Sequence, residues 1–160
     1  MKKILILISL LMLTGCPQKP QPPINTSQFV TEIEFLVNST RQETFPKQDQ
    51  PTAILTAESA LFDAAQKYAE LMAERKQLSH NVDGQTLRMR VNNSGYNRWT
   101  TIGENIAMGF KDTDSLFKSW MDSPGHRANI LNPKFKDTGI GIAKDNNGTI
   151  YYCQIFGAAN

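Results

Sequence analysis

The order of hydrophobic patterns along the chain constrains its fold more than any other feature of the sequence. In the first half, apolar residues recur at helical spacing, as in Phe29, Ile33, Leu36 and Val37. In the last quarter, two apolar runs are joined by the turn residues Asp145-Asn146-Asn147-Gly148, which is typical of a β-hairpin. Helices that precede a closing hairpin predict an α+β domain with helices packed on a small antiparallel sheet.

The same patterns predict where the individual elements lie. Helices are expected over residues 27–40, from a cap at Thr56 to about Leu78, over residues 85–92, and from a cap at Asp112 or Thr113 to a stop at Pro124-Gly125. Strands are expected within residues 99–108, with an interruption at Gly103-Glu104-Asn105, and over residues 138–143 and 150–156.

The N-terminus has the features of a bacterial lipoprotein signal peptide. Lys2-Lys3 precede a short apolar run over residues 4–12, which is shorter than the roughly 20 residues that a spanning helix needs. The run leads into Leu13-Thr14-Gly15-Cys16, which is similar to a lipobox. We therefore expect residues 1–15 to be removed and Cys16 to carry lipid that anchors the chain to a membrane. The alternative is an ordinary secretory signal in which the cysteine is incidental.

The segment after Cys16 is rich in proline, with Pro17, Pro20, Pro22 and Pro23 among Gln and Lys residues. Such a sequence favours an extended, semi-rigid spacer. Residues 16–26 are thus predicted to form a tether and residues 27–160 a single domain. The expected location is the cell envelope, with the domain lipid-anchored at the outer membrane or the cell surface.

Charge and cysteine content narrow the classes of partner. Loss of residues 1–15 reduces the 17 basic residues to 15, which equals the 15 acidic residues. A chain without net positive charge is not expected to bind nucleic acid.

If Cys16 carries lipid, Cys153 has no partner in the chain, so we expect a monomer that folds without disulfides and buries Cys153 as a free thiol. An intermolecular disulfide through Cys153 is the alternative.

The only two histidines, His80 and His126, lie beside turn-forming residues, which favours a surface cleft over a core position. Imidazole is the side chain best suited to proton transfer near neutral pH and to transition-metal binding. Between the two histidines lies Gly103-Glu104-Asn105.

Four segments in this order resemble the CAP superfamily of cysteine-rich secretory, antigen 5 and pathogenesis-related proteins, also called SCP-like proteins, and in particular its bacterial branch. They are Gly103-Glu104-Asn105, the run over residues 123–131, the Gly139-Ile140-Gly141-Ile142-Ala143 segment and the run over residues 151–156. The resemblance extends from about Phe29 to the C-terminus and implies a three-layer α-β-α sandwich.

The resemblance also implies a cleft in which two histidines face two glutamates. His80, Glu104 and His126 match three of these four positions, and Ser123 occupies the fourth, with Asp122 one residue away. His80 and His126 are then candidate ligands for Zn²⁺ or another divalent metal, with Glu104 accepting a hydrogen bond from an imidazole. Each residue also has a structural alternative: His80 as a helix-end residue, His126 as a turn residue, and Glu104 as a buried carboxylate.

Three functions remain open at this point. The preferred one is a surface binding module for a lipid, sterol, glycan or host protein, with a degenerate His/Glu cleft and no required cofactor. The alternative is a weak metal-dependent hydrolase, a peptidase or esterase that uses His80, Glu104 and His126. No Gly-x-Ser-x-Gly elbow, His-Glu-x-x-His helix or obvious nucleophile supports an enzyme. The third is a rigid structural display element.

Overall fold

The computed structural model describes residues 25–45 and 54–160 of the 160-residue chain. The predicted signal peptide over residues 1–15, the predicted lipidation site Cys16 and the tether up to residue 24 lie outside the described residues. Across the two described ranges, no helix has both the length and the apolar character needed to span a bilayer.

A four-stranded sheet forms the middle layer of the domain, with the strand order β1-β3-β4-β2. Its strands are β1 (Thr56–Ala57), β2 (Trp99–Met108), β3 (Asp137–Lys144) and β4 (Ile150–Ala159). The central strand β4 pairs antiparallel with β2 and β3, whereas the two-residue β1 pairs parallel with β3. The sheet is therefore antiparallel, as predicted, except at this short edge.

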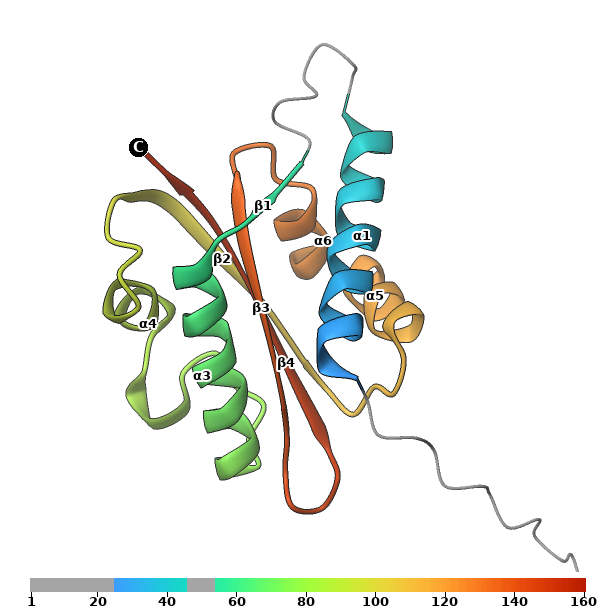
Figure 1. The fold of residues 1–160 in the computed structure, drawn as a ribbon, viewed down its shortest axis with the longest axis vertical. Helices are drawn as coiled ribbons and strands as arrows, with labels where there is room; N and C mark the ends of the chain where they lie inside the picture. Colours follow the sequence, from blue (N-terminus) through green and yellow to red (C-terminus); the bar gives the residue numbers. More distant parts are fainter. Residues whose placement is uncertain (1–24, 46–53) are drawn as a thin grey trace, which may run out of the picture.

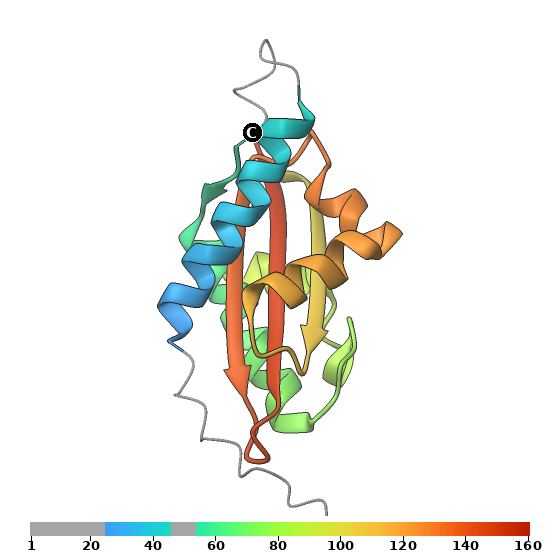
Figure 2. The same cartoon turned by 90° about the vertical axis from the view of Figure 1, so that its right-hand side faces the viewer.

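Helices cover both faces of the sheet (Figures 1 and 2). One face carries α1 (Thr26–Thr44), α5 (Thr113–Asp122) and α6 (Pro124–Ile130). The other carries α3 (Ser59–Arg75), the 3-10 turn η2 (Val82–Gly84) and α4 (Leu87–Asn93). This arrangement confirms the predicted α+β class and the three-layer α-β-α sandwich.

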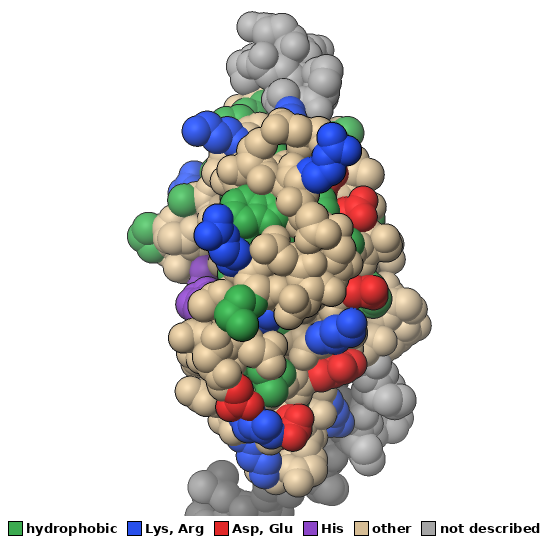
Figure 3. Space-filling view, turned by 90° about the vertical axis from the view of Figure 1, so that its left-hand side faces the viewer, with side chains coloured by type: hydrophobic (Ala, Val, Ile, Leu, Met, Phe, Trp, Pro, Cys, Tyr) green, Lys and Arg blue, Asp and Glu red, His purple; other side chains and the backbone are tan. Residues whose placement is uncertain are grey.

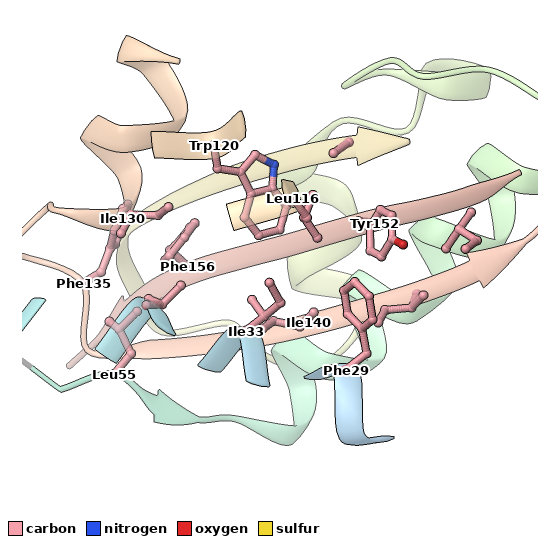
Figure 4. Close-up of a cluster of buried hydrophobic side chains, with 14 residues drawn as sticks. Phe29, Ile33, Leu55, Leu116, Trp120, Ile130, Phe135, Ile140, Tyr152 and Phe156 are labelled. Carbon is pink, nitrogen blue, oxygen red and sulfur yellow. The ribbon is translucent and has the colours of Figure 1, made fainter. Parts of the chain in front are cut away.

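Alternation along β4 divides the apolar core into two clusters, one on each face of the sheet. Tyr152 and Phe156 pack beneath α1 and α5 (Figure 4), whereas Cys153 and Ile155 pack against α3. Trp120, which its helical spacing places in the core, is fully buried. Cys153 is a buried free cysteine, as the apolar strand pattern around it predicts.

Two glycines of β3 let α3 lie directly on the sheet. A Cβ atom on Gly139 or Gly141 would overlap backbone atoms of α3. The intervening Ile140 and the following Ile142 belong to the cluster on the opposite face. The Gly-Ile-Gly-Ile segment thus contacts one helical layer through its backbone and the other through its side chains.

The predicted boundaries of α3 are wrong by a few residues. Thr56 does not cap the helix, because its N–H donates to the carbonyl of Lys136 as β1 pairs with β3. Glu58 caps α3 instead. The helix ends at Arg75, because the C-cap Lys76 adopts a left-handed conformation, and so stops short of Leu78.

One predicted strand interruption is also wrong, and one predicted helix stop proves to be the start of another helix as well. Gly103-Glu104-Asn105 does not interrupt its strand, because each of these residues pairs in register with β4. Pro124 ends α5 as predicted but at the same time begins α6, where the N–H that proline lacks would have no helical partner. His126 therefore lies in a helix and not in a turn.

The close approach of α3 gives a direct test of the packing. Gly141→Ala is expected to lower the free energy of unfolding by about 2 kcal/mol, because the new methyl group meets backbone that cannot move aside. Urea denaturation measures the free energy of unfolding of this variant and of the control variant Gly125→Ala. Gly125 has open space around its Cβ position, so the same substitution there should leave stability nearly unchanged. Equal effects at the two positions would contradict the packing argument.

Candidate functional site

Three segments that are far apart in the sequence meet at β2, an edge strand of the sheet. His80 lies in the loop between α3 and η2, Glu104 lies in β2, and His126 lies in α6 on the opposite face. His80 is largely exposed, whereas the side chain of Glu104 is only 3% exposed. A buried carboxylate thus lies beneath an exposed imidazole.

The carboxylate of Glu104 accepts hydrogen bonds at both oxygens. Nδ1 of His80 lies 2.7 Å from Oε1, and Nη1 of Arg90 lies 2.5 Å from Oε2. The thiol of Cys153 also lies 3.4 Å from Oε2. Because an ionised carboxylate only accepts hydrogen bonds, Nδ1 of His80 carries a proton and Nε2 faces away from Glu104.

Arg90 is as deeply buried as the carboxylate it binds, with 4% of its side chain exposed. Its guanidinium lies 3.3 Å from the centre of the Tyr68 ring and donates to the carbonyls of Gln85 and His80. The hydroxyl of Tyr68 donates to the carbonyl of Ser79. Arg90 and Tyr68 together therefore fix the loop that carries His80.

The contacts shift the pKa values of the pair in opposite directions. Burial raises the pKa of the Glu104 carboxyl, but the hydrogen bonds from His80 and Arg90 and their charges outweigh it, so the pKa lies below its usual value. The hydrogen bond to Glu104 raises the pKa of His80, against a smaller opposing effect of burial. Glu104 is therefore ionised near neutral pH.

His126 is held from the other side of β2. The side-chain amide of Asn105 donates to the carbonyl of His126 at 3.1 Å, and the amide of Asn129 donates to Oδ1 of Asn105 and to the carbonyl of Glu104. Burial, with a smaller contribution from the charge of His80, lowers the pKa of His126. His126 is thus anchored through Asn105, the residue that follows Glu104 in β2.

The fourth position of the predicted tetrad supplies no carboxylate to this region. Asp122 forms an exposed ion pair with Lys118, one helical turn earlier in α5. Ser123 links α5 to α6 and makes no side-chain cap. Among residues 25–45 and 54–160, no group of three His, Cys, Asp or Glu side chains is arranged to hold a metal ion. A metal at this site would have the two imidazoles as its protein ligands.

Arg90 and Tyr68 are site residues that sequence reasoning missed. Tyr68 has the helical spacing of a core residue, but its ring also contacts the guanidinium of Arg90 and its hydroxyl donates to the carbonyl of Ser79. Arg90 follows Leu87 by three residues, which places it on the inward face of α4. A cation on an apolar helix face is the signal that indicates a buried partner.

Removal of the negative charge should destabilise the domain. Glu104→Gln leaves the buried Arg90 without its counter-charge and is expected to lower the free energy of unfolding by about 3 kcal/mol. Glu43→Gln, the same change at an exposed site, should have little effect. Chemical denaturation measures both, and equal stabilities would contradict the importance of the pair.

The pH dependence of stability gives a second readout of the same pair. Because the pKa of His80 is raised, its contribution is complete below its ordinary pKa of 6.5 and is lost as the pH rises through the folded-state value. Because the pKa of Glu104 is lowered, its contribution is present above 4.5 and is lost on acidification through the folded-state value. Glu104→Gln should weaken both dependences, and an unchanged profile would contradict the assignment.

Proteins related in sequence are found in Bacillus subtilis. The chain is 30% identical to the protein YkwD over 135 residues, which is 84% of this chain and 49% of YkwD. It is also 30% identical to the membrane protein YlbC over 109 residues, which is 68% of this chain and 27% of YlbC. The chain thus spans half or less of the length of these relatives.

Solved structures with the same fold include a bacterial outer surface protein and a bacterial extracellular protein. An outer surface protein from Borrelia burgdorferi has a TM-score of 0.75 at 18% identity, over 86% of this chain and 97% of that one. An extracellular SCP-domain protein from Bacillus anthracis has a TM-score of 0.67 at 24% identity, over 86% and 45%.

A family model agrees with these likenesses. The model described as CAP: Cysteine-rich secretory protein family matches residues 35–156, which include β2, α6 and the closing hairpin. The matched range contains His80, Glu104 and His126. The chain therefore belongs to the CAP family.

Proposed function

We propose that this chain is a lipid-anchored CAP domain at the bacterial cell surface, where it works as a binding module. The observation that carries this proposal is the engagement of Glu104 by His80 and Arg90 at both oxygens. A general base needs a carboxylate oxygen that is free to take a proton and accessible to substrate. Both oxygens of Glu104 are already hydrogen-bonded and its side chain is buried, so its position suits a structural role within a degenerate cleft.

The surface location is supported by relatives and by the predicted N-terminus. The similar Borrelia burgdorferi protein is an outer surface protein, and the similar Bacillus anthracis protein is extracellular. The lipobox-like Leu13-Thr14-Gly15-Cys16 would hold the domain at the membrane through lipid on Cys16. Partners of such a module are a lipid, sterol, glycan or host protein.

Metal-dependent hydrolysis is the second candidate, and one observation favours it. The hydrogen bond from Nδ1 of His80 to Glu104 leaves Nε2 available, which is the arrangement by which carboxylates orient metal-binding histidines. NaASP2, which has a TM-score of 0.52 and 14% identity, has been crystallised with Zn²⁺. A bound metal ion would polarise a substrate carbonyl or activate water. With two imidazoles and no further His, Cys, Asp or Glu ligand in the described part of the chain, its binding would be weak.

Calorimetry with Zn²⁺ separates the two candidates. His80→Ala and His126→Ala should each weaken Zn²⁺ binding by about ten-fold or more, because each removes one of two ligands. Affinity should fall on acidification, since protonation of His80, whose pKa is raised by its hydrogen bond to Glu104, competes with the metal. Equal affinity in all three proteins would contradict a shared site. Efficient turnover of peptides or esters that both variants abolish would favour the hydrolase.

Lipidation is tested on the native protein. Mass spectrometry of the N-terminus should show cleavage after Gly15 and an acylated Cys16, because the lipobox-like sequence directs both steps. Cys16→Ala should release the protein from the membrane fraction, whereas Cys153→Ala should not. A soluble wild-type protein with a free Cys16 thiol would contradict the anchor.

A further inference from the structure

The segment that contains α4 carries basic residues without acidic ones. From Gln85 to Gly103 the sequence contains three arginines and no acidic residue. Arg90 is neutralised by Glu104 in the interior, but Arg88 and Arg98 are exposed. Neither has an ion-pair partner among the described residues. Two uncompensated guanidinium groups therefore lie on the surface.

An aromatic ring lies beside these charges. The guanidinium of Arg88 lies 5.3 Å from the centre of the Trp99 ring, and Nε1 of Trp99 donates to Oδ1 of Asn92 at 2.8 Å. Both contacts hold the half-buried indole in one orientation. In Figure 3, the part of this face beside histidine shows basic and apolar side chains without acidic ones. We call Arg88, Asn92, Arg98 and Trp99 the α4 patch.

We propose that the α4 patch binds an acidic glycan. Guanidinium groups pair with carboxylate or sulfate through parallel hydrogen bonds. The half-buried indole beside these guanidinium groups adds apolar surface that the C–H groups of a sugar ring can contact. The exposed amides of Asn93 and Asn97 add donors and acceptors for hydroxyl groups. This combination suits a negatively charged saccharide better than a purely acidic peptide, which would use the charges but not the ring.

This inference rests on the proposed binding function and names the class of partner. The surface is separate from the His80 cleft, because Arg88 faces solvent whereas Arg90, two residues later, faces the interior. Glycan binding should therefore survive His80→Ala, which tests the cleft alone.

The test is calorimetric titration of the full-length wild-type chain in detergent with hexagalacturonate. The double variant Arg88→Gln/Arg98→Gln should weaken binding by about ten-fold, because it removes both charged contacts. The matched control is Lys111→Gln/Lys144→Gln, which loses the same charge near the β3–β4 turn and should bind like the wild type. Near-UV circular dichroism checks that both variants are folded.

Two further measurements complete the test. Binding should change the tryptophan fluorescence, which reports on Trp99 because the only other tryptophan, Trp120, is fully buried. Neutral maltohexaose and a hexaglutamate peptide should bind more weakly than hexagalacturonate. Equal losses in the two double variants, or equal binding of the peptide, would overturn the proposal. If the wild-type protein binds no glycan and hydrolyses no peptide or ester, this inference is wrong but the proposed binding function is not. If the protein hydrolyses peptides or esters, the proposed binding function is wrong.

Discussion

The buried ion pair between Glu104 and Arg90 is the interaction on which the candidate site depends. It joins the edge strand β2 to α4, and both side chains are almost fully removed from solvent. A buried pair of this kind adds less stability than its short distance suggests, because both charges lose their hydration. Its effect is instead on geometry. Glu104 can orient His80 only while Arg90 holds the carboxylate in place, so the position of an exposed imidazole is set by a buried cation.

The fold reaches this arrangement by bringing both helical layers to one edge of the sheet. Glycines in β3 allow α3 to lie against the sheet, and Tyr68 on that helix contacts both Arg90 and the His80 loop. From the other layer, Asn129 reaches across to the backbone of Glu104 and to Asn105. The site thus lies between two helical layers that the sheet would otherwise separate, and its histidines come from opposite sides of β2.

The hydrophobic periodicity of the sequence predicted the helices and strands that are stabilised by burial of their own apolar side chains. The amphipathic helices and the closing hairpin were predicted within a few residues, and so was the burial of Trp120 and Cys153. Local conformations that depend on a pairing partner far away in the sequence were not predicted. Thr56 forms a strand because β3 offers a pairing edge, and Gly103-Glu104-Asn105 stays extended because β4 lies beside it. The resemblance made His80, Glu104 and His126 candidate site residues, but Arg90 was missed because its partner Glu104 is in another segment.

The seven-residue helix α4 contributes to both the candidate site and the α4 patch. Successive residues on an α-helix are about 100° apart, so Arg88 and Arg90 project about 200° from one another. The inward arginine meets Glu104 and loses its net charge, whereas the outward one lies over Trp99 and keeps it. One short helix therefore supplies a neutral, fixed interior beneath His80 and a positive exterior beside it. The two arginines therefore act separately, because Arg90 fixes the loop of His80 from inside the domain whereas Arg88 faces solvent.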